Sequence, residues 1–341
     1  MVVGATSGIG EAALKEFVRQ ATKPKCYLVG RSEQSANRII EECNAFNSDT
    51  QIVFVRADVS LVREADRLCE EINRRESAIN VLFLSAGEAV LDRSGIFLLF
   101  FFFFLAASSL IIPIETSEGL HTLAALTFYT RLRMTQLLLP LLQRSTRLAR
   151  VVNIAGGTKE GPIYPSDMQA FNVPLHAIRG HLTTLISLSH EALTAKAPDV
   201  SFLQVFPGAI RTAFFDRMPG VAGFVMRCVI TLAGKWLLVP IQERGERNAF
   251  FSTNGAFPAR YGDGDSKNGV EVMEGLGVAR GTDGNIGSGV YSVDYDGTEA
   301  GQSVMDLLGN YREEDMVERV WGHAQAEFDR ITYGPSDSLS N

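Results

Sequence analysis

Residues 4–10 read GATSGIG and follow a short apolar segment at the start of the chain. The residues that come next, 8–21, carry apolar side chains at the spacing of one helix face. Glycines permit a tight turn and a close approach of the backbone, and the free N–H groups of a helix N-terminus attract phosphate oxygens. The stretch therefore predicts a strand, a glycine turn and a helix that together bind the pyrophosphate of a dinucleotide.

Apolar runs alternate with amphipathic stretches along most of the chain. This alternation is typical of βαβ units, so the sequence predicts a doubly wound parallel sheet of the Rossmann type in a three-layer α/β/α arrangement. The expected strands are 26–29, 51–55, 81–84, 150–154, 201–206 and 290–293, and the expected helices are 8–21, 34–46, 61–75, 117–144, 176–195 and 303–330.

The composition is that of an ordinary globular protein, with 46% apolar and 21% charged residues among 341. A net charge of −7 attracts no phosphate backbone, so we expect no nucleic-acid partner. The four cysteines form no CxxC pair, and residues 1–15 lack the pattern of a secretory signal. We therefore expect a cytoplasmic protein with reduced thiols and no metal site.

Small and polar residues follow the later expected strands, at the edge where such sheets bind ligands. Arg31 stands where a ribose-binding side chain is expected, and a guanidinium with Ser32 beside it favours a 2′-phosphate, and so NADP(H). The predicted cofactor-binding residues are Gly4, Thr6, Ser7, Gly8, Ile9, Gly10, Arg31, Ser32, Asp58, Val59, Ser85, Ala86, Gly87, Pro207, Gly208 and Thr212.

Four short segments resemble the short-chain dehydrogenase/reductase family: TSGIG at 6–10, ADV at 57–59, SAG at 85–87 and PGxxxT at 207–212. The resemblance covers residues 1–255. It implies hydride transfer between NADP(H) and a carbonyl or an alcohol.

Two further segments, YLVGR at 27–31 and GVYSV at 289–293, resemble a fungal subgroup of that family that is tied to specialised metabolism. The resemblance implies that the apolar stretch 214–239 is a lid over the substrate. It also implies that the substrate is a mid-sized apolar molecule, a specialised metabolite among the candidates.

We expect one domain made of two parts. Residues 1–255 form the Rossmann-type NADP(H)-binding domain, with an apolar insertion at 95–114, and residues 256–341 add a glycine-rich loop, the last strand and C-terminal helices packed on it. Only three residues precede the glycine turn, whereas a strand usually has about five or six, so we expect a longer first strand in the full protein.

The catalytic residues of the family are an asparagine, a serine, a tyrosine and a lysine. The corresponding positions of this chain hold Thr127, the pair 155–156 (Ala-Gly), Pro174 and Ile178, so none of the four roles is filled by the expected residue. The substitute candidates are Tyr164, Lys159 and His181, followed by His176, Arg179 and Tyr129.

Residues 96–114 contain no charge and show neither a helical nor a strand period. Gly87 and Thr127 are 40 residues apart, which exceeds the family's spacing by about the length of this run. The run is therefore interpreted as an inserted segment or a translated intron. Its length also leaves open a membrane contact from one side, or a membrane span.

Two alternatives to the oxidoreductase remain open. The missing catalytic residues are compatible with an inactive protein that still binds NADP(H), and the segment 96–114 is compatible with a membrane-associated protein. The sequence also leaves open whether the chain forms a homo-oligomer.

Overall fold

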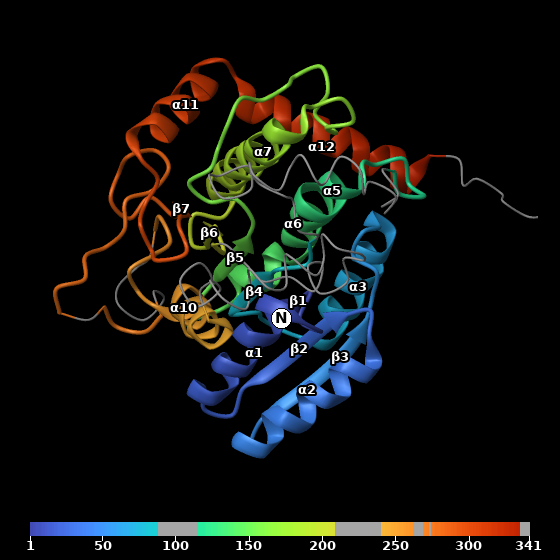
Figure 1. Cartoon of the computed structure of the whole chain (residues 1–341), viewed down its shortest axis with the longest axis vertical. Helices are drawn as coiled ribbons and strands as arrows, with labels where there is room; N and C mark the ends of the chain where they lie inside the picture. The colour runs from blue at the N-terminus through green and yellow to red at the C-terminus, as the bar shows by residue number, and fades with distance from the viewer. Residues whose placement is uncertain (88–114, 209–239, 262–268, 273, 335–341) are drawn as a thin grey trace, which may run out of the picture.

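The computed structural model describes residues 1–87, 115–208, 240–261, 269–272 and 274–334. Its centre is a seven-stranded parallel sheet with the order β3-β2-β1-β4-β5-β6-β7 (Figure 1). The strands are β1 (Val2–Val3), β2 (Lys25–Gly30), β3 (Gln51–Arg56), β4 (Val81–Leu84), β5 (Arg150–Ile154), β6 (Ser201–Val205) and β7 (Val290–Val293).

The strand β1 lies in the middle of the sheet, as the glycine turn requires. Val2 pairs with Leu28 of β2 on one side and with Phe83 of β4 on the other. The strand order reverses between β1 and β4, and open α/β sheets bind ligands at such a switch point. The predicted doubly wound parallel sheet, built as a single α/β domain, is confirmed.

One face of the sheet is covered by α1 (Gly8–Gln20), α2 (Glu33–Phe46) and α10 (Ile241–Thr253). The helix α10 was not predicted, and it packs along α1. The two backbones come close at Gly245, where a Cβ atom would lie 2.8 Å from the carbonyl oxygen of Ala12. A glycine is therefore needed at this helix crossing.

The other face carries a larger set of helices, and α12 lies over α3 and α7 (Figure 1). The set comprises α3 (Val62–Arg75), α5 (Thr122–Ala124), the π-helical segment η1 (Ala125–Tyr129), α6 (Thr130–Gln143), α7 (Leu175–Lys196), α11 (Gln302–Glu313) and α12 (Met316–Tyr333).

Two predicted helices differ from the structure. The helix expected over 117–144 begins at Thr122 and passes through η1 before it becomes α6. The helix expected over 303–330 is two helices, because Asp315 takes a left-handed backbone conformation with φ of 54°. Gly119, with a φ of 73°, precedes the later start at Thr122, whereas no glycine or proline marks the break at Asp315.

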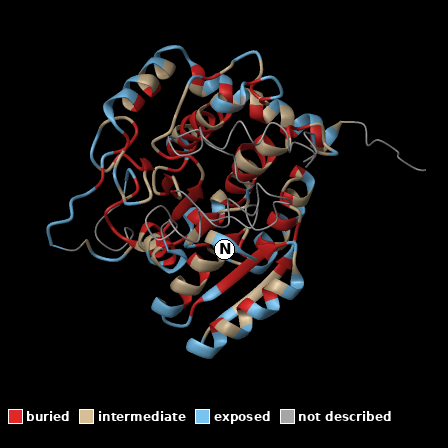
Figure 2. Ribbon diagram, viewed as in Figure 1, coloured by how far each residue is buried: buried red, intermediate tan, exposed pale blue. Residues whose placement is uncertain are grey.

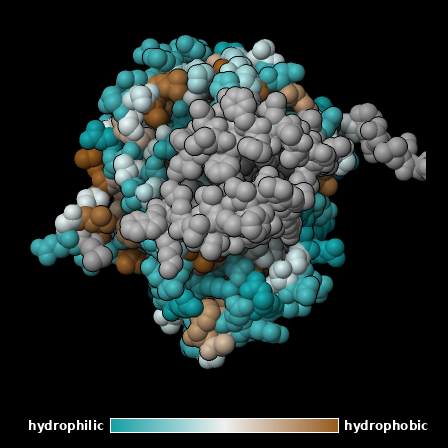
Figure 3. Space-filling model, viewed as in Figure 1, coloured by the Kyte–Doolittle hydropathy of each residue, from teal (hydrophilic) through white to brown (hydrophobic). Residues whose placement is uncertain are grey.

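The central strands are buried and the edge strand β3 is mostly half-buried, whereas the outer surfaces of the helices are exposed (Figure 2). On the face seen in Figure 3, hydrophilic residues cover most of the coloured surface around α2 and α3. Among the described residues, no helix is both long and apolar enough to cross a membrane. The apolar run 96–114 and the expected lid 214–239 lie outside the described residues.

Candidate cofactor and catalytic site

The glycine turn is closed against the end of β4. Gly4 has a φ of 81°, and a Cβ atom there would lie 2.4 Å from the backbone nitrogen of Ala86. A Cβ atom at Gly10 would lie 2.5 Å from Ser85 Oγ, which donates a hydrogen bond of 2.9 Å to the carbonyl oxygen of Val3. Only glycine fits at these two positions, so the predicted turn and the Ser-Ala pair form one unit.

The N-terminus of α1 opens from this turn. Its first residue, Gly8, has a φ of 65°, and a Cβ atom there would meet no described atom within 4 Å. Ser7 precedes the helix, and within the described chain its side chain makes no capping hydrogen bond. The first N–H groups of α1 are therefore available to an anion.

The end of β2 reaches the same turn through Thr6. A Cβ atom at Gly30 would lie 2.5 Å from Thr6 Cγ2, so the strand end and the turn are in contact. Arg31 follows directly and is exposed, and no hydrogen bond or ion pair joins its guanidinium to another described residue. Ser32 instead caps α2, because its hydroxyl accepts a hydrogen bond of 3.2 Å from the N–H of Ser35.

The remaining predicted cofactor residues lie at other strand ends. Asp58, after β3, accepts hydrogen bonds from the N–H and the hydroxyl of Ser60, at 3.1 and 2.8 Å. Gly208, after β6, approaches the ring of Tyr295, since a Cβ atom there would lie 3.2 Å from its Cγ. Val59 is buried, Ile9 and Pro207 are half-buried, and Gly87 is exposed. Thr212 lies outside the described residues.

A buried arginine holds the ends of β4 and β5 together. Arg131 of α6 donates from Nη2 to the carbonyl oxygen of Ala86 at 2.5 Å and from Nη1 to that of Ile154 at 2.7 Å. Its Nη1 also donates to Asn153 Oδ1, and its Nε donates to the carbonyl oxygen of Leu126 at 2.8 Å. Burial lowers the pKa of this guanidinium to about 9. Sequence reasoning missed this residue, because no motif contains it.

A row of polar side chains crosses the sheet beside Arg131. The register pairs Asn153 with Gln204 and Gln204 with Ser292, so the three side chains share the face that α7 covers. Ser292 Oγ donates to the carboxylate of Glu160 at 2.6 Å, and Ser187 Oγ of α7 donates to the same oxygen at 2.8 Å. Burial raises the pKa of Glu160.

Lys159 joins the ends of β5, β6 and β7. Its Nζ lies 2.9 Å from Asp294 Oδ2 and 5.2 Å from the ring centroid of Phe206. The neighbouring Thr158 has a φ of 66°, and its hydroxyl donates to the same oxygen of Asp294 at 3.3 Å. A β-branched residue in the left-handed region is strained, and such strain is concentrated at functional sites.

The other substitute candidates for the catalytic residues differ in burial and in their contacts. His181 is fully buried, and its Nδ1 accepts from the N–H of Tyr164 at 3.2 Å while its Nε2 faces the carbonyl oxygen of Met168 at 3.2 Å. Burial lowers the pKa of His181. The buried hydroxyl of Tyr129 lies 2.7 Å from Nε2 of His323 on α12, whereas His176 is exposed and Arg179 is half-buried.

The positions of the missing catalytic residues explain part of their absence. A Cβ atom at Gly156 would overlap the hydroxyl of Thr183, so a serine does not fit there. Pro174 is exposed and precedes α7, whereas Ile178 belongs to the core of that helix. Thr127 lies half-buried in η1. Lys159 is therefore the only one of the three leading candidates, among the described residues, with an ion pair at the sheet edge.

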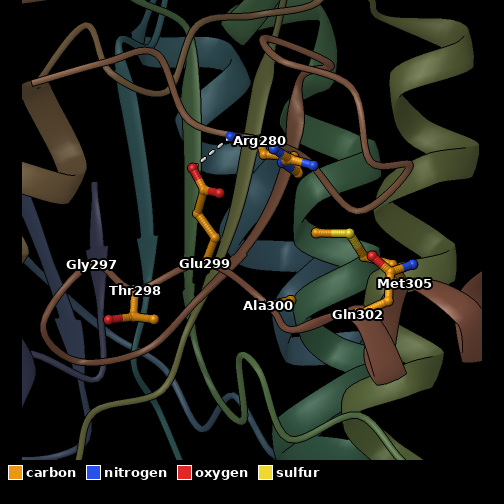
Figure 4. Close-up of a pocket in the computed structure, with 7 residues that line it drawn as sticks. All are labelled: Arg280, Gly297, Thr298, Glu299, Ala300, Gln302 and Met305. Carbon is orange, nitrogen blue, oxygen red and sulfur yellow. Dashed lines mark hydrogen bonds between the residues drawn. The ribbon is translucent and has the colours of Figure 1, made fainter.

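An open cavity of about 530 Å³ lies elsewhere, beside the residues that follow β7 (Figure 4). Its walls include Glu299, whose Oε1 accepts a hydrogen bond of 2.7 Å from the backbone N–H of Arg280. It contains none of the predicted cofactor or catalytic residues. No group of three or more possible metal ligands occurs among the described residues.

Comparison with known proteins decides the family. The family model described as short chain dehydrogenase matches residues 1–217. The chain belongs to this family. This short-chain dehydrogenase is 31% identical to the oxidoreductase andH of Emericella variicolor, over 97% of this chain and 91% of that protein.

Two other proteins show how far the similarity extends. The short-chain dehydrogenase/reductase SAT2 of Stachybotrys chartarum is 25% identical over 97% of this chain and 91% of its own. A solved Pseudomonas aeruginosa structure, the RhlG/NADP active-site complex, covers 81% of this chain and 94% of its own with a TM-score of 0.51. Its identity to this chain is 15%, so it supports the fold. The resemblance to the short-chain dehydrogenase/reductase family, stated from the sequence motifs, is confirmed.

Proposed function

We propose that this short-chain dehydrogenase is an NADP(H)-dependent enzyme that reduces a carbonyl group or oxidises an alcohol on a mid-sized apolar substrate. The observation that carries the proposal is the glycine turn. Gly4 and Gly10 press against Ser85 and Ala86, and the turn leaves the N-terminus of α1 open to an anion.

The residues around the turn fit a dinucleotide phosphate. The N–H groups that begin α1 would hold the pyrophosphate, and Arg31 would hold a 2′-phosphate on the adenosine ribose. Asp58 and Val59, which follow β3, would border the adenine. When bound, NADPH supplies a hydride from its nicotinamide ring.

Lys159 is the proposed proton donor. Reduction transfers a hydride to the carbonyl carbon, and the carbonyl oxygen then takes a proton from Lys159 Nζ. Asp294 would keep this ammonium at the sheet edge through its 2.9 Å ion pair, and the hydroxyl of Thr158 would hold Asp294 in turn. Oxidation of an alcohol reverses both transfers.

The first experiment titrates the whole protein with NADPH and follows the tryptophan and cofactor fluorescence. A panel of apolar ketones and aldehydes then tests turnover by the loss of NADPH absorbance. Saturable binding with turnover of at least one carbonyl compound is expected. Binding without turnover of any compound would favour the inactive NADP(H)-binding protein, and no binding at all would contradict the proposal.

The role of Lys159 is tested by the variants Lys159→Met and Lys159→Arg. Removal of the proton donor should lower kcat by about 100-fold or more, since general acid catalysis contributes about 10² to 10⁴. NADPH affinity should stay within about twofold, because Lys159 is assigned no cofactor contact. Arg75→Met, an exposed change on α3, is the control for folding and assay. Unchanged kcat in Lys159→Met would remove this residue from the mechanism.

A further inference from the structure

Arg131 places a fixed positive charge beneath the edge of the sheet. Its side chain is 4% exposed, and its hydrogen-bond acceptors are the carbonyl oxygens of Leu84, Ala86, Ile154 and Leu126 together with Asn153 Oδ1. Among the described residues, no carboxylate makes a hydrogen bond or an ion pair with it. An arginine stays protonated at neutral pH, so this charge is not neutralised by a direct partner.

The surroundings of Arg131 do little to screen this charge. His190 of α7 lies beside it, and burial followed by the charge of Arg131 lowers the pKa of that imidazole to about 3, so it is neutral at pH 7. A cavity of about 10 Å³ between them has room for about one water molecule. The carboxylate of Glu160 lies beyond β6, next to Ser292 of β7.

The position of Arg131 in the topology relates it to one half of the cofactor. A dinucleotide crosses a doubly wound sheet at the switch point, which lies here between β1 and β4. Arg31 follows β2, so the adenosine half would lie on the side of β2 and β3. The nicotinamide half would then lie over the ends of β4 and β5, and these are the strand ends that Arg131 holds.

We infer that the buried charge of Arg131 makes the site prefer NADPH over NADP⁺. The inference rests on the proposed function. The dihydronicotinamide ring of NADPH is neutral, whereas the ring of NADP⁺ carries a positive charge that a buried guanidinium repels. The pyrophosphate and the adenosine half are the same in both forms. Arg131 therefore acts on the ratio of the two affinities, so that the site takes up NADPH in preference to NADP⁺ and releases NADP⁺ more readily.

The test measures the dissociation constants of NADPH and NADP⁺ by calorimetry, without any substrate. The main variant is Asn153→Asp, which is isosteric and places a carboxylate on the Arg131 guanidinium. Two unit charges about 10 Å apart, at an effective dielectric constant of about 20, change an equilibrium constant by roughly tenfold. We therefore expect the ratio Kd(NADP⁺)/Kd(NADPH) to fall roughly tenfold. Arg131→Met, which removes the charge, should also lower this ratio. Arg131→Lys, which keeps the charge, should leave the ratio near its wild-type value.

The control is Arg150→Met. Arg150 is also a buried arginine that donates to backbone carbonyl oxygens, but it lies at the opposite end of β5, where it bonds to Phe251 and Phe257. Its loss should weaken both forms of the cofactor equally or neither. If Asn153→Asp binds both forms with the wild-type ratio, the inference is wrong while the proposed function stands. If the wild-type chain binds neither form, the proposed function itself is wrong, and the inference falls with it.

Discussion

The two halves of the sheet edge are built in different ways. Around β1, β2 and the end of β4, close contacts between backbones are made by small residues, with Gly4 and Gly10 against Ser85 and Ala86. Around β5, β6 and β7, the contacts are made by buried polar and charged side chains such as Arg131. The first half is thus specified by glycines and other small residues. The second half is specified by the strand register that brings distant side chains together.

This difference bears on how the two halves tolerate change. A backbone turn fails when any atom is added to it, whereas a polar network fails when one partner loses its charge or its protonation state. The halves should therefore respond to different perturbations, and each of the following experiments separates them.

The largest effect is expected for Gly4→Ala. The added Cβ atom would lie 2.4 Å from Ala86 N, and the φ of 81° is strained for any other residue. Overpacking and backbone strain each cost about 1–3 kcal/mol, so the free energy of unfolding should fall by about 3–5 kcal/mol. Urea unfolding measures this. The control Gly322→Ala, on the exposed side of α12, should not lower the free energy of unfolding. An equal free energy of unfolding for the two variants would contradict the closed turn.

The second effect is a loss of stability at low pH that comes from the buried His190. Its folded pKa of about 3 lies below the value of about 6.5 in an unfolded chain. Its contribution to stability is therefore complete above pH 6.5 and is lost as the pH falls from there towards 3, by about 1.4 kcal/mol per pH unit. Urea unfolding of wild type and His190→Gln at pH 7, 6 and 5 should give a difference that shrinks or reverses at low pH. Parallel pH profiles would contradict the assignment.

The third effect belongs to the cofactor half. Arg31→Ala should weaken NADPH binding by roughly tenfold, because a hydrogen bond to a charged group contributes about 1.5–3 kcal/mol. NADH has no 2′-phosphate, and its affinity should stay unchanged. Fluorescence titration with both cofactors checks this, with Arg74→Ala on the exposed side of α3 as the control. An equal loss for both cofactors would place Arg31 away from the 2′-phosphate.

The smallest effect is expected for Thr158→Gly. Glycine adopts the φ of 66° freely, so removal of the strain should stabilise the fold by about 1 kcal/mol, reduced by the lost hydrogen bond to Asp294. Turnover should fall at the same time, because Asp294 then holds Lys159 less firmly. A more stable variant with full activity would show that the strain has no function.

Much of the fold was predictable from local patterns. Apolar runs placed β4, β5 and β7 with the bounds found in the structure, and the alternation with helices predicted the parallel sheet. The helix α10 and the break at Asp315 were not predicted. The packing of α10 depends on one close approach at Gly245. A single left-handed residue such as Asp315 does not change the helical pattern of the sequence, so it cannot be predicted from that pattern.

The candidate site was predictable only in its backbone half. Gly4 and Gly10 indicate the turn in the sequence, because no other residue fits at these positions. Arg131, Glu160 and Asp294 could not be found in this way, since each is a common residue on a common element. Arg131 bonds to Asn153, Glu160 accepts from Ser292, and Asp294 follows β7. Their places at the sheet edge depend on the register that sets Asn153 beside Gln204 and Gln204 beside Ser292, and that register becomes visible only once the sheet is assembled.

The strand β7 also has a consequence for the order in which the site is made. It pairs with β6 across a long stretch of chain, and Asp294, the partner of Lys159, follows directly after it. A ribosome adds about 5–20 residues per second, so the residues from Val205 to Val290 take several seconds to emerge. During that interval a nascent chain has the glycine turn but lacks the carboxylate that holds Lys159. The proposed proton donor therefore gains its ion pair only after β7 has been synthesised and has paired with β6.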